Sequence, residues 1–196
     1  MARRSDKGKS QAGRLRIVAG NWRSRLLEIA SVEGLRPTSE RIRETLFNWL
    51  APTLSGARCL DLFAGTGALG LEALSRGAGS TVFVERSPVA VKQLRSNIDL
   101  LGADGASVVA GDAREYLRSA SESFDIVFLD PPFAADILGE TCRLLAETDC
   151  LADGALVYLE EDRSRKEPAL PEGWQVLKNK TAGNVRYMLA RTGRDD

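Results

Sequence analysis

The sequence predicts an α/β fold: a Rossmann-like, seven-stranded, mostly parallel sheet with helices on both faces. From about residue 56 onward, short apolar runs with strand character alternate with helical patterns, which is typical of a parallel sheet. A glycine-rich turn joins the first of these strands to the first helix. Only residues 179–185 separate the last two strand patterns. That is too short for a crossover helix, so we expect an antiparallel hairpin at the end of the chain.

Length and composition favour one well-packed domain with a small extension. The chain has 196 residues, of which 43% are hydrophobic and 28% are charged, as in ordinary globular proteins. We expect a flexible basic tail over 1–13, an extension of a hairpin and a helix over 14–55, and the main α/β domain over 56–196. The formal net charge is +0, but basic residues concentrate in the first quarter of the chain. This asymmetry predicts a basic arm for a polyanion on an acidic body.

Several classes of protein are excluded by what the sequence lacks. It has no apolar run near the roughly 20 residues that a membrane span needs, and no secretory signal follows its basic start. The cysteines Cys59, Cys142 and Cys150 show no CxxC spacing, which favours free thiols in a cytoplasmic protein. Histidine is absent, which excludes an imidazole base and removes the commonest transition-metal ligand. We therefore expect no metal, and catalysis by carboxylates, backbone groups or a cofactor.

The extension contains two predicted elements. Residues 14–29 alternate basic and apolar positions around Gly20-Asn21, which predicts a short hairpin. Further on, Thr38 is a candidate cap for a helix. Ile42, Leu46 and Trp49 lie at helical spacing and would form its apolar face.

The main domain follows in strands and helices. The predicted strands are Arg58–Leu62, Thr81–Glu85, Ser107–Ala110, Asp125–Leu129, Ala155–Glu160, Trp174–Lys178 and Arg186–Ala190. One helix begins at Ser87-Pro88, a cap followed by proline at the first helical position, and ends at Gly102. Another covers about residues 137–145, on the spacing of its apolar residues.

The glycine-rich turn "CLDLFAGTGALGLEAL" indicates a nucleotide-type cofactor. Gly65, Gly67 and Gly70 match G-x-G-x-x-G, and Glu85 ends the second strand. This spacing alone also fits a nicotinamide dinucleotide. We expect Gly70 to pack the helix against the sheet rather than to touch a ligand.

Acidic residues after the first three strands favour S-adenosylmethionine as the cofactor. Asp61 comes just before the glycine loop, where it would repel a pyrophosphate but attract an ammonium and a sulfonium. Glu85 would accept the ribose hydroxyls. Asp112 would accept the adenine amino group, or cap a helix, and the Ala113 N–H would serve a ring nitrogen. The predicted cofactor-binding residues are Asp61, Ala64, Gly65, Thr66, Gly67, Glu85, Asp112 and Ala113.

The stretch "FLDPPF" ends the fourth strand with a rigid acidic corner. A nucleobase amine is a poor nucleophile, and its N–H groups need fixed acceptors. Asp130 supplies a carboxylate and Pro131 a carbonyl, and Pro131 and Pro132 hold both still. Phe133 offers a face on which an unstacked base can lie. These four residues are the predicted catalytic group for direct methyl transfer, in which orientation supplies most of the rate.

Taken in order, "DLFAGTGALGLEALSRG", "VFVE", "GDA" and "DPPF" resemble the class I methyltransferases that modify exocyclic amines. The upstream "RIVAGNWRSRLL" and "LRPTSERIRETLFNWL" resemble the RsmD family, bacterial enzymes that methylate guanine N2 in 16S rRNA. The resemblance covers about residues 14–191. It implies that residues 56–196 form an S-adenosylmethionine-dependent methyltransferase domain acting on the small ribosomal subunit or its assembly intermediate. One departure is Ser24, where glycine is expected.

The resemblance gives the basic extension a role in RNA binding. Arg16, Arg23 and Arg25 would contact phosphates. Trp22 would stack on a base or pack on the body. Arg36, Thr38 and Arg41 would close over the cofactor and the target base, or make cap and ion-pair contacts. We expect a monomer. The alternatives are an adenine-N6 methyltransferase, a nicotinamide-dependent oxidoreductase, and an RNA-binding assembly factor whose catalytic corner is idle.

Overall fold

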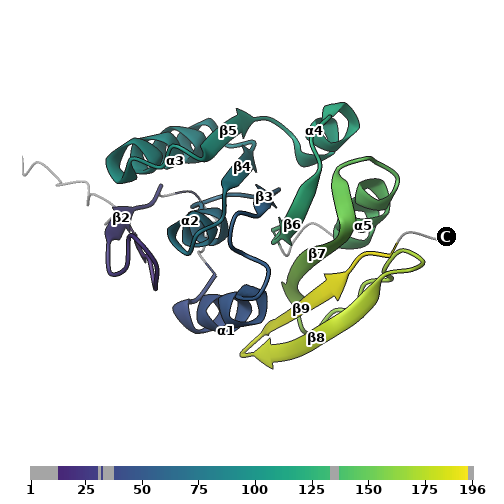
Figure 1. Cartoon of the computed structure of the whole chain (residues 1–196). Helices are drawn as coiled ribbons and strands as arrows, with labels where there is room; N and C mark the ends of the chain where they lie inside the picture. The colour runs from purple at the N-terminus through teal and green to yellow at the C-terminus, as the bar shows by residue number, and fades with distance from the viewer. Residues whose placement is uncertain (1–12, 31, 33–37, 133–136, 194–196) are drawn as a thin grey trace, which may run out of the picture.

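The computed structural model describes residues 13–30, 32, 38–132 and 137–193. Within these residues, seven strands form one sheet in the order β5-β4-β3-β6-β7-β9-β8 (Figure 1). The strands are β3 (Arg58–Asp61), β4 (Ser80–Glu85), β5 (Ala106–Ala110), β6 (Phe124–Leu129), β7 (Leu151–Asp162), β8 (Gln175–Ala182) and β9 (Val185–Arg191). Strands β5, β4, β3, β6 and β7 are parallel neighbours, whereas β9 is antiparallel to both β7 and β8. The predicted α/β fold is therefore confirmed.

Helices cover both faces of the sheet. The helices are α1 (Glu40–Leu50), α2 (Ala68–Ser75), α3 (Pro88–Leu101), α4 (Ala113–Ser119) and α5 (Leu138–Ala146). On one face, α4 and α5 pack against alternate residues of the central strands. On the other face, α1 and α2 pack against the remaining residues. The alternation of inward and outward side chains along each strand lets one sheet bury apolar residues on both sides.

Helix α3 begins and ends where the sequence predicts. Ser87 caps it by accepting a hydrogen bond from the Ala90 N–H, and Pro88 is its first residue. Gly102 follows in the left-handed conformation, with φ +60°, which glycine adopts at little cost.

Helix α1 differs from the prediction at its start and on its buried face. Its N-cap is Ser39, whose side chain accepts from the Ile42 N–H, and not Thr38. Ile42 and Leu46 are buried as predicted, but Phe47 and Leu50 are buried too. Trp49 is only partly buried and stacks on Tyr187 with ring centroids 5.4 Å apart. The buried stripe is thus wider than the spacing of Ile42, Leu46 and Trp49 indicates.

The carboxyl-terminal hairpin is tighter than predicted. Strand β8 continues to Ala182 and β9 begins at Val185, so only Gly183 and Asn184 form the turn. Gly183 has φ +58°, as a two-residue hairpin turn requires. The exposed polar residues 178–181 mask this extension of β8 in the sequence, because an edge strand needs little apolar surface.

The amino-terminal hairpin forms as predicted and packs on the body. Strands β1 (Arg14–Arg16) and β2 (Leu26–Glu28) pair in antiparallel fashion. Their inward side chains, Leu15 and Leu27, pack against residues of α2, β4 and α3. In Figure 1 the hairpin lies beside α2, on the side away from β7.

Ser24 gives the hairpin a strained turn. It has φ +66°, whereas every other described residue with positive φ is glycine. This is the position where glycine is expected by resemblance, and the backbone has the conformation that glycine favours.

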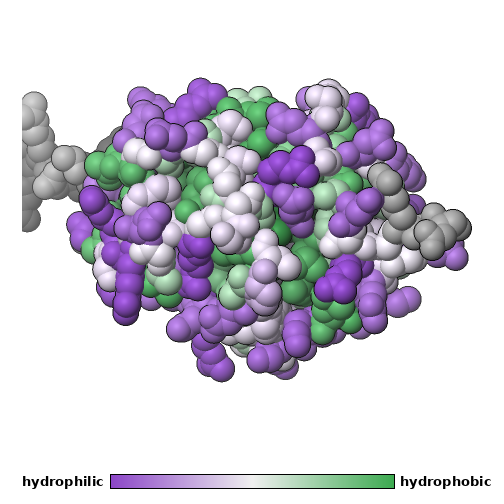
Figure 2. Space-filling model, viewed as in Figure 1, coloured by the Kyte–Doolittle hydropathy of each residue, from purple (hydrophilic) through white to green (hydrophobic). Residues whose placement is uncertain are grey.

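Surface polarity is mixed on the face shown in Figure 2, where hydrophobic residues form several patches separated by hydrophilic ones. Leu26, Val89, Leu100, Val109 and Val176 are the large hydrophobic side chains exposed among the described residues. None of the described helices is both long and apolar enough to cross a membrane.

Candidate functional site

The predicted site residues meet at one edge of the sheet, which we call the carboxyl edge because the parallel strands end there. Asp61 ends β3, Glu85 ends β4, Asp112 follows β5 and Asp130 follows β6. The chain runs outward from β3 to β5 and then returns to β6 on the other side of β3. Ligands of open α/β sheets bind at such a reversal of strand order.

The glycine loop between β3 and α2 is fixed by backbone hydrogen bonds. The Ala64 N–H donates to the Val84 carbonyl at 2.9 Å, and the Gly67 N–H donates to the Ala64 carbonyl at 2.7 Å. Gly65 and Gly67 have φ of +52° and +78°, which side chains disfavour. A Cβ on Gly67 would also lie 2.5 Å from Leu94 Cδ1. With Thr66 buried between them, these residues form a cradle made mainly of backbone.

Asp61 is buried and holds the start of α2. Its Oδ2 accepts a hydrogen bond from the Gly70 N–H at 3.0 Å, so it caps a helix whose own N-cap, Gly67, has no side chain. Burial raises the pKa of Asp61 to about 7, and the nearby Glu85 carboxylate adds to the shift. A bound cation would stabilise the ionised Asp61 carboxylate and so offset the free-energy cost of burying its charge.

Gly70 packs the helix against the sheet, as predicted. A Cβ at this position would lie 2.2 Å from Cε1 of Phe83 and 2.8 Å from Cγ2 of Thr81. Helix α2 can approach β4 this closely only because position 70 has no side chain.

Glu85 is held by two backbone donors. Oε2 accepts from the Gly65 N–H at 2.8 Å and Oε1 accepts from the Ser87 N–H at 2.7 Å. Each carboxylate oxygen keeps a second lone pair for another donor. Glu85 is therefore a fixed acceptor next to the glycine loop.

Asp112 has the helix-capping geometry that the sequence leaves open. It is the N-cap of α4, and its side chain accepts from the Arg114 N–H at 2.9 Å. Partial burial raises the pKa of Asp112, but hydrogen bonds from Arg114 and Glu115 and the Arg114 charge together lower it. Ala113 is the first residue of α4 and is buried. Asp112 therefore remains an ionised acceptor at the carboxyl edge.

The acidic corner lies at the end of β6. Asp130 is partly exposed, Pro131 is buried and Pro132 is exposed, whereas Phe133 lies outside the described residues. The Thr38 hydroxyl donates to Asp130 Oδ2 at 3.1 Å. Desolvation, and then the Glu160 carboxylate, raise the pKa of Asp130 well above its ordinary value.

Tyr158 and Glu160, which the sequence analysis missed as site residues, lie at this corner together with Thr38, which was expected near the cofactor and the target base. Glu160 is buried near the end of β7, and the Tyr158 hydroxyl donates to its Oε2 at 2.8 Å. Burial raises the pKa of Glu160 to about 7, against hydrogen bonds from Tyr158 and Thr38. An acid two residues after a tyrosine in an otherwise apolar strand is the signal that could have identified Glu160 in advance.

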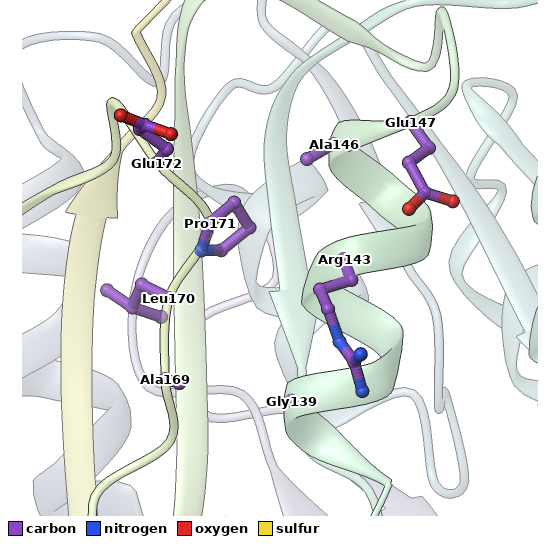
Figure 3. Close-up of a pocket in the computed structure, with 8 residues that line it drawn as sticks. All are labelled: Gly139, Arg143, Ala146, Glu147, Ala169, Leu170, Pro171 and Glu172. Carbon is purple, nitrogen blue, oxygen red and sulfur yellow. The ribbon is translucent and has the colours of Figure 1, made fainter.

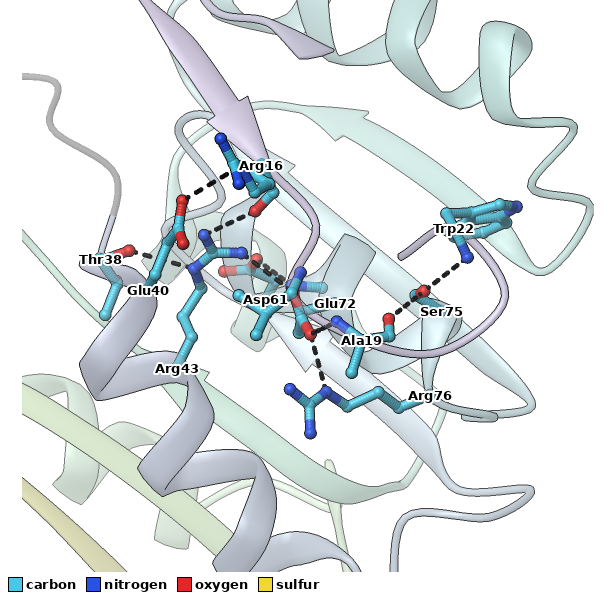
Figure 4. Close-up of polar contacts among 12 residues, drawn as sticks. Arg16, Ala19, Trp22, Thr38, Glu40, Arg43, Asp61, Glu72, Ser75 and Arg76 are labelled. Atoms are coloured by element: carbon cyan, nitrogen blue, oxygen red, sulfur yellow. Dashed lines mark hydrogen bonds and ion pairs between the residues drawn. The ribbon is translucent and has the colours of Figure 1, made fainter. Parts of the chain in front are cut away.

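A buried ionic cluster of Arg43, Glu72 and Arg76 joins the hairpin to this site (Figure 4). Glu72 is 0% exposed and accepts hydrogen bonds from Arg43, Arg76 and the backbone N–H groups of Val18 and Ala19, at 2.7–3.0 Å.

The same cluster reaches both the hairpin and Thr38. Arg43 also donates to the carbonyls of Thr38 and Arg16, at 3.1 and 2.8 Å. The sequence does not predict these contacts, because an arginine in an amphipathic helix is normally assigned to its exposed face.

The residues predicted to bind RNA differ in their surroundings. Arg23, Arg25 and Arg41 are exposed, and Arg36 lies outside the described residues. Arg16 is exposed, with its guanidinium 3.8 Å from the Glu40 carboxylate. Trp22 is partly buried and packs with the hairpin core, and its backbone N–H donates to Ser75 Oγ. Of the two roles considered for Trp22, the structure favours packing on the body.

Two hollows lie away from the predicted catalytic corner. One, of about 510 Å³, lies between α5 and residues 169–172 (Figure 3). The other, of about 520 Å³, lies between α3 and the end of β5 and is lined by residues such as Arg86, Lys92 and Arg95. Neither is lined by Asp61, Glu85 or Asp130.

The donors and acceptors at the carboxyl edge suit an adenosyl compound with a cationic group. Glu85 accepts from the Gly65 N–H within the backbone cradle, and Asp61 accepts from the Gly70 N–H just after it. All three cysteines are buried with free thiols, and burial raises the pKa of Cys59 and Cys142 to about 12. Among the described residues no group of acids, cysteines or histidines is arranged to hold a metal ion.

Comparisons with known proteins agree with this chemistry. The family model described as "Conserved hypothetical protein 95" matches residues 15–191. The ribosomal RNA small subunit methyltransferase D of Escherichia coli is 46% identical over 92% of this chain and 91% of its own length. The solved structure of the putative methyltransferase yhhF from Escherichia coli has a TM-score of 0.87 at 42% identity, covering 92% of this chain and 99% of that one. A putative methyltransferase solved in complex with SAH shares the fold at a TM-score of 0.74 and 13% identity, covering 97% of this chain and 58% of that one.

Proposed function

Because this chain belongs to the RsmD family, we propose that it methylates the exocyclic N2 amine of a guanine in 16S rRNA, with S-adenosylmethionine as the methyl donor. Methylation of ribosomal RNA follows from the family, whose Escherichia coli member is named a small subunit methyltransferase. The choice of guanine as the target base, and of its N2 amine as the methylated atom, is what the proposal adds. The nicotinamide-dependent alternative is rejected, because the relatives are methyltransferases.

The cofactor residues are proposed on the geometry of the carboxyl edge. S-adenosylmethionine supplies a methyl group on a cationic sulfur. Asp61 would accept from its ammonium group and Glu85 from its ribose hydroxyls. Asp112 and the Ala113 N–H would bind the adenine edge, and residues 64–67 would line the cradle. The carboxylates of Asp61, Glu85 and Asp112 are each held in place by a hydrogen bond from a backbone N–H.

The geometry of the acidic corner is the main observation that supports methylation of an amine. The Asp130 carboxylate is held by Thr38 at the end of β6 and is next to a proline that has no N–H. Two fixed acceptors, Asp130 Oδ and the Pro131 carbonyl, would orient the target amine with little reorganisation as its charge develops. Asp130 could then take the proton that the methylated amine loses. Phe133 would stack on the base.

The exposed basic residues of the extension would position the RNA. Arg23 and Arg25 are exposed on the hairpin, and neither forms an ion pair with an acid among the residues that the structure describes. Contacts of this kind bind phosphates regardless of sequence and weaken with salt. Replacing both arginines with glutamine should reduce the slope of log K against log salt by about 0.7–0.9 for each lost phosphate contact. Arg118→Gln, on exposed α4, is the matched control, and an equal slope in the double variant would exclude these arginines from phosphate contact.

The decisive experiment is methylation of naked 16S rRNA and of intact small subunits from an unmodified strain, with the product nucleoside identified by mass spectrometry. We expect N2-methylguanosine, formed on assembled or partly assembled subunits. Methyladenosine would support the adenine-N6 alternative instead.

Asp130→Ala should bind cofactor normally but lose most of its turnover. Full function in this variant would favour an assembly factor with an idle corner. Weaker cofactor binding with normal turnover at saturation would show that Asp130 belongs to the cofactor site.

A further inference from the structure

Three carboxylates lie on neighbouring strands of the carboxyl edge. Asp61 pairs in register with Phe128 of β6, two residues before Asp130. Leu129 pairs with Leu159 of β7, so Asp130 and Glu160 each follow directly after a paired residue. Asp61 and Glu160 are 2% and 4% exposed. The sheet therefore places three acids together where little water reaches two of them.

Their described hydrogen-bond donors are neutral. Gly70 N–H donates to Asp61, Thr38 Oγ1 to Asp130 and Tyr158 Oη to Glu160. Within the described part of the chain, none of the three acids forms an ion pair. The nearest buried guanidinium, that of Arg43, donates to the Thr38 carbonyl instead.

One hydroxyl serves two of these acids. Thr38 donates to Asp130 and also stabilises the charged form of Glu160. A threonine hydroxyl carries a single proton, so it cannot donate to both carboxylates at once. Among the residues that the structure describes, the other titratable groups that face the pair are Asp61, Tyr158 and Tyr187, and none of these three is a cation at neutral pH. Like charges crowded in this way hold a proton between them rather than ionise fully.

We propose that Glu160 is a positioning residue for methyl transfer: it shares a proton with Asp130 in the ligand-free protein, and the pair releases that proton to solvent when the cationic methyl donor binds. The sulfonium charge then takes the place of the proton charge at the carboxyl edge. Asp130 becomes a fully ionised acceptor for the target amine only in the loaded enzyme. This inference rests on the proposed function and adds Glu160 to its machinery. The raised pKa values of Asp130 and Glu160, both due first to desolvation, agree with it.

Isothermal titration calorimetry at pH 7 tests this directly in the wild-type protein. The binding enthalpy of S-adenosylmethionine is measured in buffers with different ionisation enthalpies, which gives the number of protons released. S-adenosylhomocysteine is the matched ligand, because it has the same amino acid and ribose groups but a neutral sulfur. We expect release of up to about one proton more with S-adenosylmethionine. Equal proton release for the two ligands would overturn the inference, whereas no binding of S-adenosylmethionine would overturn the proposed function itself.

The Glu160→Gln variant tests whether the extra proton release comes from the pair of Asp130 and Glu160. Glutamine keeps the size of the side chain and an acceptor for Tyr158, but removes the charge. The extra proton release should disappear, and the acid limb of the single-turnover rate should move about one pH unit or more lower, because Asp130 loses a like-charged neighbour. Glu161→Gln is the control: it is the next residue on β7, on the other face, and it pairs with Arg186 at 2.8 Å. If Glu160→Gln releases as many protons as the wild-type protein and has an unshifted pH profile, Glu160 does not have this role. If the variant does not fold, the comparison of S-adenosylmethionine with S-adenosylhomocysteine in the wild-type protein still tests the proton release.

Discussion

Breaking the buried ionic cluster should destabilise the protein by several kcal/mol, and the structure predicts which partner matters more. Glu72→Gln leaves Arg43, which is 1% exposed, without a carboxylate, so that its charge faces only neutral acceptors: the glutamine amide oxygen and the carbonyls of Thr38 and Arg16. Removing one partner of a buried ion pair costs about 3–5 kcal/mol. We expect the upper part of this range, because Arg76 loses the same partner.

The reverse substitution, Arg43→Met, should cost less. Glu72 would keep Arg76 at 2.7 Å and the N–H groups of Val18 and Ala19, so its charge would still be compensated. Methionine also fills part of the space of the arginine stem. We expect a loss of about 3 kcal/mol, at the lower end of the range for a broken buried pair.

Urea denaturation followed by circular dichroism measures both losses, provided that the slope of unfolding free energy against urea is unchanged. Glu44→Gln is the control: it is an exposed acid on the same helix, where substitutions change stability by about 0.5 kcal/mol or less. A loss below about 1 kcal/mol in Glu72→Gln would contradict the view that the cluster holds the hairpin on the body. A larger loss in Arg43→Met than in Glu72→Gln would show that Arg76 does not compensate Glu72.

Two further predictions concern single residues. Ser24→Gly should stabilise the protein by about 0.5–1 kcal/mol. The left-handed backbone conformation is strained for serine, and relief of this strain outweighs the larger entropy that a glycine loses on folding. A lower unfolding temperature in this variant would contradict the strain. Asp61 has a pKa of about 7 in the folded protein, above its unfolded value of about 4, so it disfavours folding progressively as pH rises from about 4 through 7. Asp61→Asn should therefore raise the unfolding free energy at pH 8 but not at pH 4, and it should weaken S-adenosylmethionine binding. An equal increase in unfolding free energy at both pH values would exclude the titration of Asp61 as the cause.

The sequence predicts most of the fold because local signals agree with the packing. Ser87, Pro88 and Gly102 mark α3 at both ends, and the buried strands read as apolar runs. Strand β8 is the counterexample: its outer half is polar and exposed, so neither composition nor periodicity marks its end. A helix cap is equally local, and Thr38 and Ser39 are both good caps by type. Tertiary contacts decide between them, because Thr38 donates to Asp130 instead.

The candidate site is only partly visible in the sequence. Asp61, Glu85, Asp112 and Asp130 each follow or end a strand, so the parallel topology alone predicts that they meet. Glu160 has a local signal in Tyr158, two residues before it, but its place beside Asp130 depends on the pairing of β6 with β7. Arg43 becomes evident only in three dimensions, because its carboxylate partner, Glu72, lies 29 positions away. Charged residues inside an apolar pattern are normally assigned to the exposed face of an element, and burial by a distant partner overrides that assignment.

The dependence of the hairpin on Glu72 has a consequence for the way the chain folds during its own synthesis. The N–H groups of Val18 and Ala19 bond to an acceptor that lies 54 and 53 positions later in the chain. At about 5–20 residues per second, a ribosome needs roughly 3–11 s to add that stretch. The hairpin therefore stays undocked until α2 has followed it out of the exit tunnel, so a nascent RsmD-family protein would complete this extension only after part of the main domain has been made.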